Sequence, residues 1–554
     1  MSANDPNFLR FRPRFHIIAP QGWMNDPCGP CYNPKTGEYN VFFQWNPSGN
    51  NWGNISWGKA VSKDLVSWEI DGWPVLTPTE PYDCKGIFTG CVVPTGDTLT
   101  CFYTSVSHLP ISHEMNYTRG SETLSVADGK TFQRHEGNPI LPGPPDGLDV
   151  TGWRDPYVAQ WPALDRLRGK SEGSNLYGVI SGGIRSKTPT AFLYAINPEK
   201  LQEWTFLSIL TNVGINSHPT HLRWSGALGK NWEVLNFVSL TDKADGTELQ
   251  VLIMSVEGCD QPGHHGRRAQ LWLSGELLNT VDGPQLTPSF WGRLDHGCLY
   301  AANGFWDPVA KKQLIYGWIT EDDLADDNRK RQGWSGCLSF PRVASLVTLR
   351  GVMSGWVSPL DQMTHIKAEK ETGGRGYIVR TLGSFPDMRV ATGLRSKATK
   401  KTISSVSDSI ELSSGHAWEV NIDACLEDNC GNVGIKIGNI ELRFSPITET
   451  FTIIRPRASE DGINTQPEMA PHTLFRMVDG TTENLQIQAW RDQSVLEVFV
   501  NRRTAITTRV YEEVGEGEGE RVRFVGDTGN VGGVKGEVWD GVSAGVIVKR
   551  ERRE

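Results

Sequence analysis

The chain has few cysteines, no long apolar run and no excess of basic residues. Ten cysteines in 554 residues are too few for a disulfide-held scaffold. No apolar stretch approaches the roughly 20 residues that a membrane-spanning helix needs. The formal net charge of −9 and the pI of about 5.8 exclude nucleic acid and an anionic membrane surface as expected partners. The N-terminal residues lack the pattern of a secretory leader, which predicts a cytoplasmic protein or a secreted one whose leader was removed.

Two of the cysteines form the segment Cys28-Gly29-Pro30-Cys31, which is the pattern of thioredoxin-like redox sites. That chemistry needs the first cysteine at the start of a helix, where the helix dipole lowers the thiol pKa. Residues 38–45 read instead as a strand that follows a turn, so the redox interpretation is disfavoured. A zinc site is equally disfavoured, because no second ligand pair follows at zinc-site spacing.

Helical periodicity is also scarce, whereas short strand-like segments are frequent. Runs of β-branched and aromatic residues are separated by clusters of Gly, Pro, Asn and Asp. The clearest runs are residues 39–45, 99–106, 176–184, 191–196, 232–240 and 314–320. A chain with 59 Gly, 32 Pro and many short strands is predicted to be all-β, as a barrel, a propeller or a sandwich.

The composition changes after about Arg342, which predicts two domains. Residues 1–350 form the first domain, residues 351–376 are polar and are predicted as a linker, and residues 377–554 form the second domain. In the last of these ranges the strands alternate cleanly between apolar and polar residues. This alternation is typical of a sandwich of two antiparallel sheets. No exact internal repeat is visible, so self-similarity does not reveal propeller blades.

Two short segments carry an Asp before a Pro and beside a Trp, at residues 23–27 (Trp-Met-Asn-Asp-Pro) and 153–156 (Trp-Arg-Asp-Pro). The proline holds the residue before it out of the helical region, so Asp26 and Asp155 lie on stiff, extended backbone. The tryptophan supplies a flat apolar face that can stack on a sugar ring. Paired carboxylates on rigid backbone beside aromatics indicate chemistry on a carbohydrate, where two acids straddle one bond.

Further segments accompany these two in a fixed order. They are residues 22–27 (GWMNDP), 42–47 (FFQWNP), 52–60 (WGNISWGKA), 88–90 (FTG), 153–156 (WRDP), 295–297 (DHG) with 300–302 (YAA), and 333–336 (GWSG) with 340–342 (FPR). This series resembles glycoside hydrolase family 32, which includes invertases, inulinases and fructosyltransferases. Residues 496–501 and 507–511 are similar to the C-terminal sandwich of that family, so the resemblance spans nearly the whole chain.

The resemblance implies a five-bladed β-propeller that carries the active site, followed by a C-terminal β-sandwich. The nucleophile of the family matches Asp26, and its transition-state stabiliser matches Asp155, beside Arg154. The positions that line the fructosyl pocket match Asn25, Gln44, Trp52, Phe88, Thr89 and Tyr300. The resemblance implies no metal and no organic cofactor.

The third acid of the family departs from the usual pattern. The common Glu-Cys-Pro tripeptide is absent, and Glu233, at the start of a predicted strand, is the best match. Some fungal members with transferase activity are similar here, and they also resemble this chain in carrying Cys after Asp-Pro, at Cys28. We therefore expect hydrolysis of sucrose and, in concentrated sucrose, transfer that gives kestose-type oligosaccharides.

Retaining transfer needs one ionised carboxylate to attack the anomeric carbon and one protonated carboxyl group to donate to the leaving oxygen. Differences in burial and neighbouring charge are expected to leave Asp26 ionised and Glu233 protonated. Two alternatives stay open: a sugar-binding propeller without catalysis, and a propeller glycosidase acting on arabinan or xylan. The sandwich is predicted to be structural, with a possible homodimer interface.

Overall fold

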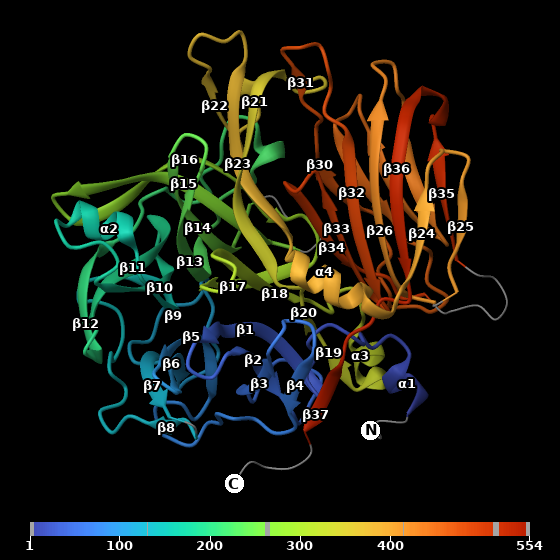
Figure 1. Cartoon of the computed structure of the whole chain (residues 1–554). Coiled ribbons are helices and arrows are strands. Elements are labelled where there is room, and N and C mark those ends of the chain that lie inside the picture. The colour runs from blue at the N-terminus through green and yellow to red at the C-terminus, as the bar shows by residue number, and fades with distance from the viewer. Residues whose placement is uncertain (1–4, 130, 261–265, 414, 513–519, 550–554) are drawn as a thin grey trace.

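The structure is a computed structural model that describes residues 5–129, 131–260, 266–413, 415–512 and 520–549 (Figure 1). Strands dominate these residues, and the α-helices are short: α1 (Pro6–Leu9), α2 (Pro162–Leu167), α3 (Asp326–Gln332) and α4 (Met388–Leu394). The ends of the two predicted domains, residues 1–4 and 550–554, lie outside the described ranges. No helix in the described ranges is long and apolar enough to cross a membrane.

The first part of the chain forms five sheets, each built mainly from antiparallel strands that follow one another in sequence. The first two blades consist of β1 (Gly22–Asn33), β2 (Glu38–Asn46), β3 (Ser56–Ser62) and β4 (Trp68–Asp71), then β5 (Gly86–Thr95), β6 (Thr98–Val106), β7 (Glu122–Asp128) and β8 (Gln133–Arg134). The next two consist of β9 (Val150–Ala159), β10 (Leu176–Ile184), β11 (Thr188–Asn197) and β12 (Lys200–Ile209), then β13 (Asn231–Thr241), β14 (Glu248–Glu257), β15 (Arg268–Thr280) and β16 (Gly283–Asp295).

The fifth blade is larger than the others. It contains β17 (Leu299–Asp307), β18 (Lys312–Ile319), β21 (Arg342–Ser354), β23 (Tyr377–Pro386) and β22 (Lys367–Lys370), with β20 (Cys337–Leu338) and β31 (Arg476–Met477) at its sides. Residues 351–376, predicted as a linker, include β22, and β23 continues the sheet of the fifth blade. The predicted domain boundaries stay a prediction.

The five blades close into a ring. The first strand of each blade contacts the first strand of the next, in the order β1, β5, β9, β13, β17 and back to β1. Strand β1 also pairs in parallel with β19 (Trp334–Ser335), a short strand that follows the first strands of the fifth blade in sequence. This pairing helps to close the ring. The first strands of the blades are buried along most of their length, because they are covered by the neighbouring blades on both faces. The predicted propeller is confirmed.

The second part of the chain is a sandwich of two antiparallel sheets of six strands each, as predicted (Figure 1). One sheet has the order β24 (Thr399–Ile403), β36 (Val531–Asp540), β26 (Ala417–Leu426), β32 (Leu485–Asp492), β33 (Val495–Val500) and β34 (Thr504–Arg509). The other has β25 (Ser409–Glu411), β35 (Arg521–Gly526), β27 (Val433–Ile437), β28 (Ile440–Ser445), β29 (Thr450–Ile454) and β30 (Glu468–Pro471). Apolar side chains from both sheets form the core between them.

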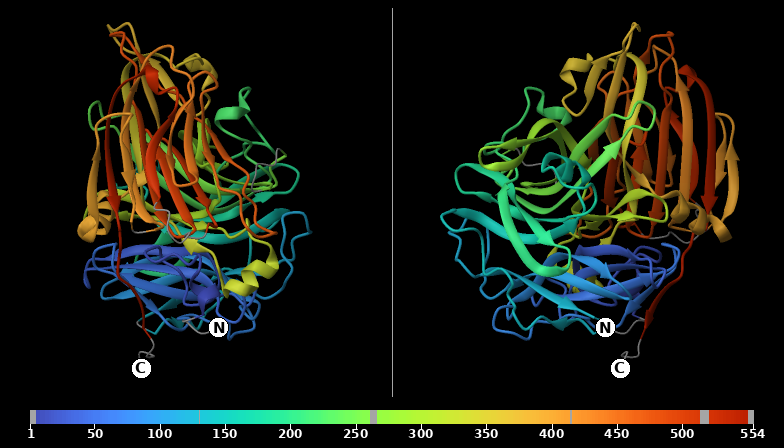
Figure 2. Two further views of the ribbon diagram at one scale, coloured as in Figure 1. Left: turned by 90° about the vertical axis from the view of Figure 1, so that its right-hand side faces the viewer. Right: turned by 60° about the vertical axis from the view of Figure 1, so that its left-hand side comes forward.

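The last strand, β37 (Val546–Lys549), leaves the sandwich and pairs in parallel with β4 of the first blade. Figure 2 shows this segment in red, running from the sandwich along the blue first blade in both views. The end of the described chain therefore ties the second domain to the beginning of the first.

A buried charge network joins the propeller to the sandwich. The guanidinium of Arg342 donates to Asp295 at 2.7 Å, to Glu497 at 2.5 Å and to the hydroxyl of Thr507 at 2.5 Å. Beside it, Gly297 lies so close to the sandwich that a Cβ atom there would be 1.8 Å from the carbonyl oxygen of Thr507. The segments 295–297 and 340–342, which carried part of the family resemblance, thus build the domain interface.

Candidate active site

The first strands of the blades share a local irregularity near the axis of the ring. Strand pairing shifts by a β-bulge between Met24 and Pro27, between Ile87 and Gly90, opposite Arg154–Tyr157, between Glu233 and Asn236, and between Tyr300 and Asn303. A bulge bends its strand and redirects the side chains beside it. The predicted site residues of these strands lie at or next to these five shifts.

Three of these positions have a strained backbone. Asp155, Val234 and Ala301 have φ angles of 61°, 48° and 52°, in the left-handed region that side chains rarely adopt. The extended backbone expected at Asp155 from the proline after it is therefore wrong. Such a conformation costs about 1–3 kcal/mol and occurs mainly where function requires it. At Val234 the strained backbone has a structural role, because its N–H group donates a hydrogen bond to Asp155 Oδ2 at 3.1 Å.

Asp26 is held by a chain of side-chain hydrogen bonds. Thr89 donates to Asp26 Oδ2 at 2.5 Å, and Gln44 in turn donates to the Thr89 hydroxyl at 2.6 Å. The Asn25 amide donates to Asp26 Oδ1 at 3.0 Å and to Gln44 at 2.8 Å, and it accepts from Trp23. Three predicted pocket residues, Asn25, Gln44 and Thr89, therefore orient the predicted nucleophile.

Asp155 is buried at the corresponding point of the third blade. Burial raises its pKa well above the ordinary range; the nearby carboxylates of Glu233 and Asp26 add to this, and the Arg154 guanidinium opposes it. The backbone N–H of Asp155 donates to Thr104 Oγ1 at 2.7 Å, which fixes the strained turn from the second blade.

Glu233 faces two of the other predicted site residues. Arg154 donates to Glu233 Oε1 through two nitrogens, at 3.0 and 2.7 Å, and the Tyr300 hydroxyl donates to Glu233 Oε2 at 2.8 Å. Burial raises the pKa of Glu233, the neighbouring Glu257 raises it further, and Arg154 lowers it. The net upward shift favours the protonated form that a general acid requires.

The pKa of Asp26 is shifted in the direction opposite to the one expected for an ionised nucleophile. Burial raises its pKa above the usual value, while the hydrogen bonds from Thr89 and Asn25 lower it. Both carboxyl groups of the acid–nucleophile pair are thus shifted upward, and the predicted ionised state of Asp26 depends on its hydrogen-bond donors. The sequence could not show this balance, because it depends on how closely the blades pack.

Glu257 and Glu122 belong to the same cluster and were missed in the sequence. Arg154 donates to Glu257 at 3.1 Å and to Glu122 at 3.0 Å, so its guanidinium joins three glutamates. Burial alone would raise the pKa of Glu257, but its pairing with His113 and the charge of Arg154 lower it to about 2. Glu257 pairs with Asn231 across the hairpin of the fourth blade, and the register of that hairpin was the only signal that could have placed it.

The aromatic pocket residues lie at the edge of this cluster. Phe88 and Tyr300 are buried in one apolar group with Trp23 and Trp318. Trp52 is 47% exposed and meets the Phe88 ring edge-on, with centroids 5.5 Å apart. Trp52 therefore offers an aromatic surface to solvent next to the acids.

Arg268 and a cavity lie on the far side of Tyr300. The Arg268 guanidinium stacks on the Tyr300 ring at 5.1 Å and pairs with Asp322 at 2.6 Å. Both residues line a cavity of about 240 Å³ that also involves Glu468 and Met469 of sandwich strand β30. The surroundings of the acids thus reach the boundary between the two domains.

Cys28 lies inside strand β1, not at the start of a helix. It is fully buried, its thiol donates to the carbonyl oxygen of Asp26 at 3.4 Å, and burial raises its pKa well above the usual value. A redox cysteine needs the opposite shift. The structure agrees with rejecting the redox interpretation.

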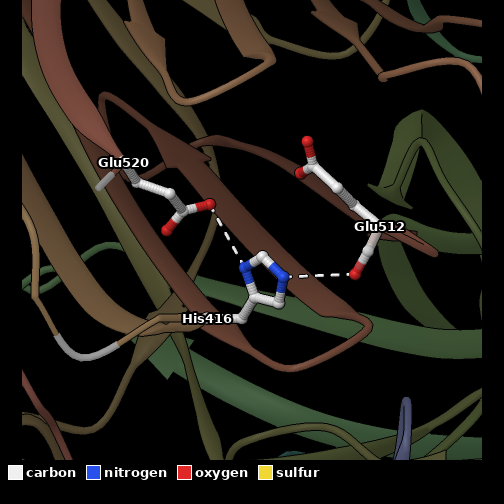
Figure 3. Close-up of side chains that lie close together, drawn as sticks. All are labelled: His416, Glu512 and Glu520. Atoms are coloured by element: carbon white, nitrogen blue, oxygen red, sulfur yellow. Dashed lines mark hydrogen bonds and ion pairs between the residues drawn. The ribbon is translucent and has the colours of Figure 1, made fainter. Parts of the chain in front are cut away.

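One group in the described part of the chain has the spacing of a metal site, far from these acids in sequence. His416, Glu512 and Glu520 place their ligand atoms within 4.8 Å of one another (Figure 3). The His416 ring contacts Glu520 Oε1 at 3.2 Å and the Glu512 carbonyl oxygen at 3.1 Å. The Arg491 guanidinium lies 3.3 and 2.8 Å from the two carboxylates, so a cation already occupies the place that a metal would take.

Comparisons with known proteins agree with the geometry. The model of the glycosyl hydrolases family 32 N-terminal domain matches residues 16–356, and that of the family 32 C-terminal domain matches residues 389–540. The chain therefore belongs to glycoside hydrolase family 32, and it is a glycoside hydrolase of the β-fructofuranosidase type.

The relatives are distant in sequence but cover nearly the whole chain. An insoluble-isoenzyme β-fructofuranosidase of Arabidopsis thaliana is 24% identical over 94% of this chain and 93% of its own length. The structure of an Aspergillus kawachii β-fructofuranosidase complexed with glycerol is 26% identical, with a TM-score of 0.83 over 97% of this chain and 95% of that one. A fructosyltransferase from A. japonicus, at 23% identity, shares the fold with a TM-score of 0.85 over 98% and 97% of the two chains.

Sugars are present in structures of more distant homologues. A Bombyx mori β-fructofuranosidase variant is in complex with sucrose, and a Cichorium intybus fructan 1-exohydrolase variant is in complex with 1-kestose. Each is 19% identical to this chain, so the likeness to this chain is one of fold.

Proposed function

We propose that the protein is a retaining β-fructofuranosidase that acts on sucrose, with Asp26, Asp155 and Glu233 as its catalytic acids. The observation that carries the proposal is the convergence of these three acids, from three blades, at the bulges of the inner strands β1, β9 and β13. Each of the three carboxyl groups is close enough to influence the pKa of another.

In the first step, a carboxylate oxygen of Asp26 attacks C2 of the fructosyl unit. The bond from C2 to the glucosyl oxygen breaks, and the Glu233 carboxyl group gives its proton to that oxygen, which releases glucose. In the second step, the Glu233 carboxylate takes a proton from water or from a sugar hydroxyl. That oxygen attacks C2, and the bond to Asp26 breaks. Asp155 accepts hydrogen bonds from the fructosyl hydroxyls as positive charge develops on the ring.

The test is the turnover of sucrose by Asp26→Asn beside a matched surface variant, Asp282→Asn. The amide cannot act as the nucleophile, so we expect a loss of at least a thousandfold in kcat for Asp26→Asn and none for Asp282→Asn. More than a few per cent of residual turnover would disprove the assignment of the nucleophile. Equal activity of the parent on arabinan or xylan, or sugar binding without any turnover, would favour the two alternatives.

We further propose that the enzyme transfers fructosyl units to sucrose when sucrose is concentrated. The support is the Cys at position 28 and the absence of Glu-Cys-Pro, both shared with the fungal transferring branch. The cavity beside Tyr300 and Arg268 gives room near the acids in which an acceptor could lie. A difference of about 1.4 kcal/mol in the binding of the two acceptors at the transition state changes the product ratio tenfold.

The measurement is the ratio of free glucose to free fructose over a series of sucrose concentrations. Hydrolysis releases the two sugars equally, whereas transfer releases glucose and keeps fructose in oligosaccharides. We expect a ratio near one in dilute sucrose and a clear rise toward molar sucrose. A ratio that stays at one throughout would show a plain hydrolase.

A further inference from the structure

A second cavity, of about 480 Å³, lies between the first two blades of the propeller. Its lining comes from β2, β3 and β4 of the first blade and from the turns of the second, shown in blue in the lower part of Figure 1. Its polar and aromatic lining includes Glu38, Asn40, Lys59, Asp71, Trp73 and Phe132. The volume is in the range of ordinary small-molecule sites.

The cavity opens at the end of the blades opposite to the acids. In the first blade, Met24 pairs with Trp45 beside Asp26, whereas Asn33 pairs with Glu38 at the other end of the same two strands. Asn33 lies seven positions after Asp26 along β1. At about 3.3 Å per residue this places the cavity roughly 20 Å from the proposed nucleophile. It is a separate site.

An exposed aromatic ring stands at the cavity. Trp73 is 58% exposed, which is unusual for so large an apolar side chain. Phe132 lies in the wall, and the ammonium group of Lys59 is 5.6 Å from the centre of its ring. A flat apolar face next to polar groups is the arrangement that binds a sugar ring through its C–H face.

Two carboxylates of the lining are open acceptors. In the described part of the chain, no hydrogen bond or ion pair engages the carboxylates of Glu38 and Asp71. The amide of Asn40 is buried nearby and donates to the backbone carbonyl of Glu38 at 3.2 Å. Carboxylates without partners can accept hydrogen bonds from the hydroxyl groups of a ligand.

The charges of the lining narrow the class of ligand. The described lining contains three carboxylates, of Glu38, Asp71 and Asp97, and one ammonium group, of Lys59, so an anion would be repelled. Ligand atoms that could hold one metal ion lie within 4.8 Å of one another, and the three carboxylates do not meet this condition among the described residues. A bound cation is therefore also disfavoured. A neutral molecule rich in hydroxyl groups fits both conditions.

We propose that this cavity binds a neutral oligosaccharide, with one sugar ring stacked on Trp73 and its hydroxyl groups donating to Glu38 and Asp71. Such a site would hold a carbohydrate chain on the enzyme at a distance from the acids. The proposal does not depend on the chemistry of the active site.

The test is affinity electrophoresis through gels that contain inulin, arabinan or xylan, performed in the Asp26→Asn background so that the polymer stays intact. We expect at least one polymer to retard the protein, and Trp73→Ala to weaken that retardation tenfold or more. Trp306→Ala is the matched control, because Trp306 is 54% exposed at the end of β17 and does not line the cavity. Glu38→Gln combined with Asp71→Asn should also weaken the retardation.

In the parent background, kcat/KM for sucrose should be the same for Trp73→Ala and for the unaltered enzyme. This measurement distinguishes the two sites. If the assignment of the active site is wrong, the sucrose assay alone will show it, whereas a wrong assignment of the second site will appear in the retardation. Retardation by none of the three polymers, or equal retardation of Trp73→Ala and its parent, would overturn the proposal.

Discussion

At the scale of single residues, the candidate site depends on how each carboxyl group is held. Asp26 accepts hydrogen bonds from Thr89 and Asn25, whereas Glu233 accepts from Arg154 and Tyr300. Burial raises the pKa of both acids. The donors to Asp26 oppose this shift, and the ionised state predicted for the nucleophile depends on them.

The first prediction concerns Thr89→Val, which removes the donor to Asp26 without a large change in volume. The pKa of Asp26 should rise, because one of the interactions that lower it is lost. A nucleophile must be ionised, so the acid limb of the kcat/KM profile for sucrose should move to higher pH by up to about one unit. The alkaline limb, which reports the deprotonation of Glu233, should stay in place.

The control is Thr98→Val, whose hydroxyl donates to the carbonyl oxygen of Thr95 at the opposite end of the second blade. Its profile should match that of the parent. An acid limb that does not move in Thr89→Val would contradict the role given to this hydrogen bond.

The site residues that the sequence singled out most clearly are those next to a distinctive motif. Asp26 and Asp155 precede prolines and follow tryptophans, and the structure brings both to the axis of the propeller. Glu257 could not be found in this way, because nothing in its neighbourhood distinguishes it from a glutamate at the end of any strand. Its place depends on the register of β13 against β14, which a single sequence does not display.

At the scale of the strands, the bulges of the inner strands do most of the positioning. They allow neighbouring side chains to face the axis while the strand continues in its sheet. At the second blade the bulge also needs Gly90, since a Cβ atom there would lie 1.9 Å from the carbonyl oxygen of Phe102 in β6.

The second prediction is that Gly90→Ala destabilises the protein by about 3 kcal/mol, because the neighbouring strand must move to admit the methyl group. The shift should also displace Thr89 and lower kcat/KM for sucrose. Gly533→Ala is the control, because a Cβ atom there has no neighbour within 4 Å. Chemical denaturation of both variants measures the difference, and equal stability would contradict the packing described for β5 and β6.

The strand pattern of the sequence was sufficient to predict the class of fold, because short β-branched runs between glycine and proline clusters are a local property. The strained backbone of Val234 and Ala301 was not predictable, since neither residue type favours a positive φ. The pairing of β23 with β21 in the fifth blade could not be predicted either, because a polar stretch separates the two strands in sequence.

At the scale of the whole molecule, two domains are held together by buried charges and by a returning strand. Arg342 contacts Asp295 of the propeller and Glu497 of the sandwich, and all three side chains are buried. Strand β37 adds a second connection at the first blade. The two domains are therefore joined at two places, and Figure 2 shows the second of them, where β37 in red runs along the first blade.

The third prediction concerns Arg342→Met, which removes the guanidinium that buried Asp295 and Glu497 share and leaves Glu497 only its contact with His16. Removal of one partner of a buried ion pair typically costs 3–5 kcal/mol, so we expect a loss of about 4 kcal/mol in the free energy of unfolding. Arg350→Met is the matched control, because Arg350 makes exposed ion pairs with Asp242 and Asp245 that contribute at most about 1 kcal/mol. Similar losses in the two variants would show that the interface is not held in this way.

The central claim is that Asp26 forms a fructosyl-enzyme that Glu233 helps to form and to resolve. The most direct measurement is the reaction of Glu233→Gln with sucrose in the presence and absence of azide. Azide needs no general base, so it can attack the covalent intermediate that this variant forms. We expect a loss of at least a hundredfold in sucrose turnover, a partial recovery with azide, and a fructosyl azide product of retained β configuration. Undiminished turnover of Glu233→Gln, or an azide product of inverted configuration, would contradict it.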